Sequence, residues 1–153
     1  MSWQSVKEEV LMYAVTHFTV GLMLGQAAGN PYAAFALGLA SHVILDAIPH
    51  SDYSKTIHGI ADFVAVMAAC YVSVRLGAGA SGLVGGFSGV LPDLEVAIAH
   101  LRSGGDLSAQ KCRFFFPSHT GLVRHGRLRP PWGIVTQIAA VGAVWAVLSG
   151  SLI

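Results

Sequence analysis

Four side chains that can bind a metal ion or transfer a proton follow one another closely in GLASHVILDAIPHSDY, residues 38–53. His42 and Asp46 are four residues apart, so on a helix their side chains lie on the same face. His50 and Asp52 follow a proline that is expected to end the regular helix. Imidazole and carboxylate groups together in an apolar segment are typical of a metal site, because burying either group alone is unfavourable. A polar helix end is the simpler interpretation of a single His–Asp pair.

Comparable side chains recur along the chain, next to stripes of small residues that are spaced three or four apart. The stripes are Gly21, Gly25 and Gly29; Ala34 and Gly38; and Gly82, Gly86 and Gly89. The first stripe extends back to His17, and the third leads to Asp93. The second leads to His42 and Asp46. Small residues at this spacing let membrane helices pack closely, so we expect the polar side chains on the same stripes to face the interior of a bundle.

The polar segment FPSHTGLVRHG, residues 116–126, carries two further histidines. We expect His119 to reach a metal ion from a loop, whereas His125, which has arginines nearby, is a candidate for catalysis or phosphate contact. Asp52 is the expected general base. The predicted metal ligands are therefore His17, His42, Asp46, His50, Asp93 and His119, and the predicted catalytic residues are Asp52 and His125.

Some histidine and acidic side chains can also be explained by structural roles instead of direct metal binding. Asp93 follows a proline that ends an apolar helix, so its carboxylate either binds the metal or caps the next turn. We expect Glu95 to have a surface role and His100 to be structural. His58 and Asp62 repeat the four-residue spacing, and Asp62 is the better candidate for holding the ring of a ligating histidine from behind.

The composition indicates an integral membrane protein. Of the 153 residues, 54% are hydrophobic and 11% are charged, and the mean hydropathy is +0.61. Average soluble chains carry about 25% charged residues. No Asp, Glu, Lys or Arg occurs in residues 10–45 or 132–153, and about 20 apolar residues suffice to cross a bilayer. The residues before the first apolar run lack the positive charge of a signal peptide, so we expect that run to be a retained span.

Helix-breaking residues divide the apolar part of the chain into five helices. Gly29, Asn30 and Pro31 separate the first two of them. The expected helices cover about residues 8–28, 31–48, 57–76, 81–91 and 132–152, with one long polar loop over about 92–131. We therefore expect a single domain, residues 1–153, that is an all-α integral membrane bundle of about five transmembrane helices.

The direction of the helices gathers the predicted site at one membrane face. In the first and third helices the polar side chains lie near the start, and in the second and fourth they lie near the end. Since consecutive spans run antiparallel, all of these side chains meet the 92–131 loop at one face. Six of the nine basic residues lie between Arg102 and Arg129, so the positive-inside rule places this face in the cytoplasm and the chain in an inner or plasma membrane.

Four stretches, TH at 16–17, SHVILD at 41–46, LPDLE at 91–95 and FPSHTGLVRHG at 116–126, together resemble a family of bacterial membrane metal-dependent hydrolases. That family is related to an inner-membrane protein that binds the SOS repressor LexA. The resemblance covers about residues 12–137 and implies a metal site in a membrane protein. Two features differ: SHxxxD precedes LPD here but comes last in the family, and the usual HRGxTHS loop reads SHTGLVRH. A fainter similarity runs to all-helical zinc phospholipases C, which also use helix-borne His and Asp.

Two functions from different classes fit these features. The first is hydrolysis of a lipid or amphiphilic ester, above all a phosphoester, at the cytoplasmic membrane interface with one or two divalent ions. A mixed His/Asp set favours Zn²⁺, Mn²⁺ or Fe²⁺ over Ca²⁺ and Mg²⁺ alone. Arg113, Arg124 and Arg127 would then hold a phosphate or carboxylate of the substrate.

The alternative is a small membrane transporter or metal-handling protein in which the same His/Asp cluster binds a passing ion. A third interpretation is a membrane anchor whose loop binds a protein partner. Membrane lipid is the expected partner in each case. Nucleic acid is not, because the basic residues are not interleaved with aromatic ones. The sequence leaves the oligomeric state open.

Overall fold

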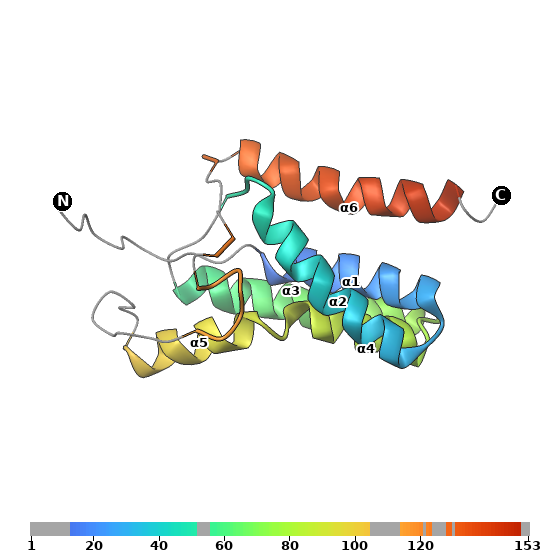
Figure 1. Cartoon of the computed structure of the whole chain (residues 1–153), viewed down its shortest axis with the longest axis horizontal. Helices are drawn as coiled ribbons and strands as arrows, with labels where there is room; N and C mark the ends of the chain where they lie inside the picture. Colours follow the sequence, from blue (N-terminus) through green and yellow to red (C-terminus); the bar gives the residue numbers. More distant parts are fainter. Residues whose placement is uncertain are drawn as a thin grey trace.

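The computed structural model describes residues 13–51, 56–104, 114–120, 122–123, 128–129 and 131–150. The regular elements within these ranges are all helices (Figure 1). They are α1 (Ala14–Ala28), α2 (Pro31–Ala47), α3 (Thr56–Arg75), α4 (Ala80–Val90), α5 (Asp93–Arg102) and α6 (Trp132–Gly150). The all-α fold class predicted from the sequence is confirmed.

Helix α5 lies within the segment that the sequence predicted to be one long polar loop, so that prediction was wrong over Asp93–Arg102. Pro92 directly precedes the helix instead of ending helical structure, because a proline is tolerated where the first N–H groups have no intrahelical partner. The first turn of α5 carries two acidic residues, and its last turn carries a histidine and an arginine. This charge order stabilises the helix through its dipole.

Two residues connect α1 to α2, one in a left-handed conformation and one whose side chain caps α2. Gly29 has a φ of 63°, a region that favours glycine, and its N–H donates to the carbonyl oxygen of Gly25. The Asn30 side chain accepts hydrogen bonds from two N–H groups in the first turn of α2. Pro31 is the first helical residue. The predicted break at these residues is confirmed.

Glycines let α1, α2 and α4 pack backbone against backbone. A Cβ atom at Gly85 would collide with the carbonyl oxygen of Gly21 and would lie 2.9 Å from the Cα of Gly25. A Cβ atom at Gly89 would lie 2.7 Å from the carbonyl oxygen of His17. Gly21, Gly25, Gly38 and Gly89 from the predicted stripes lie in these contact surfaces. Gly85, which the prediction did not include, lies at their centre, whereas a Cβ atom at Gly29 would meet nothing within 4 Å. One consequence of the close packing is that His17 lies directly against the end of α4.

The first four helices alternate in direction (Figure 1). Helices α1 and α3 run one way, and α2 and α4 run the other way, so the α1–α2 and α3–α4 connections lie at the same end. The C-terminal end of α2, the start of α5 and the segment 114–120 lie toward the opposite end. Helix α6 packs along α1, which also contacts α3. The antiparallel order that the sequence predicted is thus present.

The described part of the chain is apolar outside and polar inside. Exposed large apolar side chains cover α3 and α6, for example Phe63, Met67 and Ile138. Buried polar and charged residues outnumber buried hydrophobic ones among the described residues, and His17 and His42 are completely buried. An apolar exterior over ionisable interior groups is the arrangement expected of a membrane protein.

Helix α3 is long and apolar enough to cross a membrane. Helices α4 and α5 together form a second segment of this kind, bent by 46° at the break between them. Helix α2 and residues 132–147 of α6 are apolar but shorter. The structure thus supports one membrane-crossing helix, or two such segments if the bent pair is counted as one span.

Candidate metal centre

Five side chains from four parts of the chain meet at the end of the bundle away from the short connections. His17 comes from the first turn of α1, His42 and Asp46 come from the end of α2, and Asp93 is the first residue of α5. His119 comes from the described segment 114–120. The ligand atoms of His17, His42 and Asp93 lie within 4.8 Å of one another, as do those of His42, Asp46 and His119. His42 belongs to both groups.

The Asp46 carboxylate lies among the three imidazole rings. Its Oδ1 atom is 3.3 Å from Nε2 of His17, and its Oδ2 atom is 3.0 Å from Nε2 of His42. The same Oδ2 atom is 3.8 Å from Nε2 of His119. Asp93 approaches from the other side, with Oδ1 at 3.9 Å from Nε2 of His42 and 3.7 Å from Nε2 of His119.

The outer ring nitrogens of two of the histidines are held by hydrogen bonds. Nδ1 of His42 lies 2.8 Å from the carbonyl oxygen of Gly89, and Nδ1 of His119 lies 2.8 Å from Oε1 of Glu95. A carbonyl or carboxylate oxygen only accepts, so each Nδ1 carries the proton and each Nε2 is left to face the cluster. Histidines that bind metal ions in proteins are usually fixed in this way.

Several buried atoms at the centre have no hydrogen-bond partner among the described residues. They are both ring nitrogens of His17, Nε2 of His42 and Oδ2 of Asp93. A buried polar atom without a partner costs on the order of 1–3 kcal/mol. Unpartnered nitrogens on two adjacent rings, together with an unpartnered carboxylate oxygen, are hard to explain by packing alone.

The separations within the cluster suit a small cation. Four ligands at about 2.0–2.2 Å from a tetrahedral Zn²⁺ lie about 3.4 Å from one another. The nitrogen–oxygen separations across the cluster run from 3.0 to 3.9 Å. All but the shortest exceed an ordinary hydrogen bond between charged groups. The residues present therefore fit a small divalent metal ion.

A network of buried His–Asp ion pairs is the competing explanation, and it requires protonated rings. His17 and His42 stack with their ring centroids 4.1 Å apart, so two adjacent imidazolium charges would repel each other. Burial lowers the pKa of His119, although its hydrogen bond to Glu95 acts in the opposite direction. A ligating histidine must be neutral, and the environment of His119 favours that form.

Glu95 has a role that the sequence did not predict. Its carboxylate accepts hydrogen bonds from the N–H groups of Phe115 and Phe116 at 2.8 and 3.1 Å, in addition to the bond from His119. The expectation of a surface role was wrong, because both carboxylate oxygens are engaged by the segment that carries His119. The only local sign in the sequence is that Glu95 lies two residues after a predicted ligand, Asp93.

The remaining predicted residues lie elsewhere or outside the described ranges. His50 is buried, but its Nδ1 donates to the carbonyl oxygen of Ile48 at 2.6 Å, and the residue belongs to neither ligand group. Asp52 and His125 lie outside the described residues. His58 is exposed. Asp62 accepts from the N–H groups of Ala14 and Val15, so it caps the start of α1.

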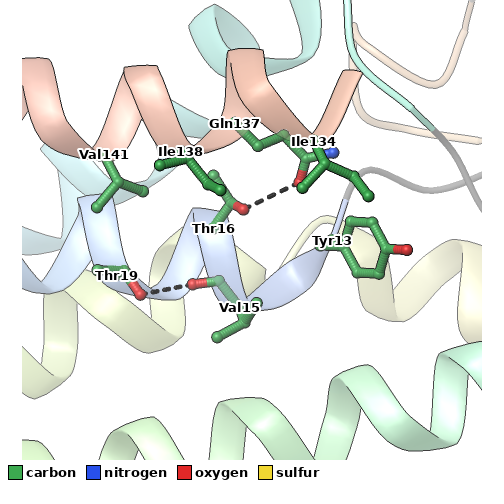
Figure 2. A pocket seen from close by; sticks show the side chains of 8 residues that line it. All are labelled: Tyr13, Val15, Thr16, Thr19, Ile134, Gln137, Ile138 and Val141. Carbon is green, nitrogen blue, oxygen red and sulfur yellow. Dashed lines mark hydrogen bonds between the residues drawn. The ribbon is translucent and has the colours of Figure 1, made fainter. Parts of the chain in front are cut away.

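An apolar groove runs between α1 and α6 (Figure 2). It has a volume of about 340 Å³ and is lined by Tyr13, Val15, Thr16, Thr19, Ile134, Gln137, Ile138 and Val141. The Thr16 hydroxyl donates to Oε1 of Gln137, and Nε2 of Gln137 donates to the carbonyl oxygen of Ser51. These bonds leave the groove with a mainly aliphatic surface. Thr16 precedes His17, so α1 contributes both to the groove and to the cluster.

Comparison with known proteins adds no relative: no family model, curated protein or solved structure matches this chain.

Proposed function

We propose that this chain is a membrane-embedded, metal-dependent hydrolase that cleaves a lipid or amphiphilic phosphoester. The observation that carries the proposal is the convergence of three imidazole Nε2 atoms on two buried carboxylates, with two of the outer ring nitrogens held by hydrogen bonds. This is the donor set of a hydrolytic metal centre. The family resemblance of the sequence points to the same chemistry.

The cluster would hold one or two divalent ions through His17, His42, Asp46, Asp93 and His119. A divalent ion of this kind lowers the pKa of a water molecule towards about 7 and polarises a phosphoryl oxygen. Zn²⁺ is the ion that three imidazoles with carboxylates favour most, and Mn²⁺ or Fe²⁺ also suits the set. Asp52 and His125 remain the proposed residues for proton transfer and substrate contact.

Substrate would approach from the side of the segment 114–120. The side chains of His17 and His42 have no exposed surface, whereas those of Asp93 and His119 are 8% and 7% exposed. Exposure rises further at Glu95, whose side chain is 21% exposed. The packed helices thus exclude water from one side of the cluster, and its least buried side lies beside His119 and Glu95.

The groove between α1 and α6 supports an amphiphilic substrate. Aliphatic side chains from both helices line it, and Ile134 and Ile138 are themselves exposed on the outer surface of the bundle. A groove of this composition on an apolar exterior suits a hydrocarbon chain. We propose that it takes an acyl chain of the substrate.

The finer placement in the membrane belongs to the same proposal. We place the bundle in the plasma or inner membrane as a multi-pass protein of about five spans, with the cluster at the cytoplasmic face. The basic residues between Arg102 and Arg129 support this orientation. Membrane lipid would surround the exposed apolar surfaces of α3 and α6.

Transport is the less favoured function, because an ion would need a path beyond the cluster. Between α1 and α4 the space is closed by direct contact of glycine backbones, with a Cβ atom at Gly25 lying only 3.0 Å from the Cα of Gly85. The cluster also lies near helix ends, whereas transporter sites usually lie near the bilayer midplane. Metal flux into proteoliposomes would favour transport over hydrolysis.

The test uses the full chain purified in detergent. Metal content is measured by mass spectrometry, and hydrolysis is measured on a lipid phosphomonoester in mixed micelles and on p-nitrophenyl phosphate. We expect near-stoichiometric Zn, Mn or Fe and measurable hydrolysis, both lost in His42→Ala and kept in the control His58→Ala, an exposed histidine of α3. A folded His42→Ala variant with unchanged hydrolysis would contradict the proposal.

A further inference from the structure

Glu95 lies outside the proposed ligand set but contacts both a ligand and the backbone that carries it. Its Oε1 atom accepts from Nδ1 of His119 and from the N–H of Phe116, and its Oε2 atom accepts from the N–H of Phe115. These three bonds span 20 to 24 residues of sequence. One carboxylate on α5 therefore fixes both the backbone and the ring of this segment.

Glu95 supplies the hydrogen bond to Nδ1 of His119, and the other contacts of this imidazole are with aromatic rings and with the carboxylates of the cluster. The segment 114–120 contains no regular helix or strand. Its turn is formed by hydrogen bonds from the N–H groups of His119 and Thr120 to the Phe116 carbonyl oxygen. The ring of Phe116 meets the ring of His42 edge to face at 6.1 Å, and the His119 ring meets those of His42 and Phe114 edge to face at 5.5 and 6.1 Å. These ring contacts supply no hydrogen bond to Nδ1 of His119. Without Glu95, Nδ1 of His119 would lose its acceptor and the ring could turn its Nε2 atom away from Asp46 and Asp93.

We propose that Glu95 is a positioning residue that aims Nε2 of His119 at the metal ion and holds the segment 114–120 over the cluster. This inference rests on the metal site of the proposed function. Because Glu95 is part of α5, it also joins Asp93 and His119, which come from different parts of the chain, into one rigid unit. A carboxylate behind a ligating histidine fixes the ring orientation and increases its basicity, and losing it typically costs about 10- to 100-fold in metal affinity.

The test is a double-mutant cycle on metal affinity. Zn²⁺ affinity is measured by competition with a chromophoric chelator for the purified wild type, Glu95→Ala, His119→Ala and the double variant. We expect Glu95→Ala to weaken Zn²⁺ binding about 10- to 100-fold. In the His119→Ala background, Glu95→Ala should change Zn²⁺ affinity by no more than about twofold, since Glu95 acts through the His119 ring.

Two further variants separate positioning from general damage. Glu95→Gln keeps one oxygen acceptor, so we expect its Zn²⁺ affinity to lie between those of the wild type and Glu95→Ala. His100→Ala, in the same helix but bonded to Thr56 rather than to the cluster, should bind Zn²⁺ like the wild type. The absorption of the Co²⁺-loaded protein gives a second readout. Glu95→Ala should shift the ligand-field bands towards those of His119→Ala, and His100→Ala should not.

The possible results distinguish this inference from the proposed function. Wild-type affinity in Glu95→Ala, or an equal loss in both backgrounds of the cycle, would overturn the positioning role and leave the hydrolase proposal standing. If the wild type binds Zn²⁺ and the double-mutant cycle gives the expected affinities, but no phosphoester is hydrolysed, only the hydrolase proposal would be overturned. A wild type that binds no metal would overturn both.

Discussion

His42 and Asp46 face each other across one turn of α2, with Nε2 of the ring 3.0 Å from Oδ2 of the carboxylate. The opposite nitrogen of the same ring donates to the carbonyl oxygen of Gly89. In the neutral ring, Nε2 therefore points a lone pair at a carboxylate oxygen, and only a proton or a metal ion can lie between them. The stacked ring of His17 opposes a second positive charge on the imidazoles. A metal ion bound here would satisfy all of these atoms together.

Replacing Asp46 by Ala should remove the bound metal. The carboxylate lies within 4 Å of all three imidazoles, so its loss removes a shared ligand and the negative charge that offsets the ion. Metal content by mass spectrometry should fall from about one ion per chain to background. The same loss is expected for His42→Ala, since His42 belongs to both ligand groups.

Ser41→Ala, next to His42, is the matched control, because its hydroxyl donates only to the Gly38 carbonyl oxygen within its own helix. Retained metal in Asp46→Ala, with an unchanged helical circular dichroism spectrum, would show that Asp46 is not a required ligand. A wild type that binds no metal would show that the cluster is a buried ion-pair network.

The antiparallel order of α1 to α4 and the gathering of the four site residues on helices were predictable because both follow from local rules. These residues are His17, His42, Asp46 and Asp93. Gly29, Asn30 and Pro31 each have a standard role at a helix boundary. The glycine stripes show which side of each helix faces inward, and His17 and Asp93 continue those stripes. Alternating helix direction then brings the polar ends together.

The roles of Glu95 and Asp62 were not predictable, because each depends on contacts between distant parts of the chain. Glu95 binds backbone N–H groups in a segment without periodicity, and no spacing rule relates residues 20 or more apart in such a segment. Asp62 repeats the spacing of a ligand pair but caps a different helix, α1. Sequence spacing identifies which residues share a helix face, but it does not identify which other part of the chain contacts that face.

Replacing Gly85 by Ala should destabilise the bundle. The added methyl group would collide with the Gly21 carbonyl oxygen and with the Cα atom of Gly25. Both are backbone atoms, which cannot rotate away as a side chain can. Overpacking of this kind costs about 1–3 kcal/mol, so thermal unfolding in detergent should begin at a lower temperature. The control is Gly142→Ala, because a Cβ atom there meets nothing within 4 Å. That change should leave the protein unchanged or slightly more stable, by up to about 1 kcal/mol. Equal unfolding temperatures for the two variants would contradict the proposed packing of α1 on α4.

Removing the cap of α1 should loosen the start of that helix and with it the placement of His17. Asp62 binds the Ala14 N–H at 2.6 Å and the Val15 N–H at 3.1 Å, so Asp62→Ala leaves both donors without this acceptor. Loss of a helix cap costs about 0.5–2 kcal/mol. We expect faster hydrogen exchange over residues 14–17, measured by mass spectrometry. Asp62→Asn, which keeps one acceptor oxygen, should show a smaller increase. Unchanged exchange in Asp62→Ala would mean that other contacts fix the start of α1.

Filling the groove between α1 and α6 should impair long-chain substrates selectively. Ile138 lines this groove and is exposed, so Ile138→Trp would occupy the volume of about 340 Å³ that we assign to an acyl chain. We expect KM for a long-chain lipid phosphomonoester to rise roughly tenfold, whereas a short water-soluble phosphoester that does not reach the groove should keep its KM.

Val135→Trp is the matched control, because Val135 is exposed on the same helix but does not line the groove. An equal rise of KM for both substrates would show that the tryptophan disturbs the metal centre itself, since the short substrate shares only that part of the site. An unchanged KM for the long-chain substrate would show that the acyl chain binds elsewhere on the apolar surface, and the groove would then have no part in substrate recognition.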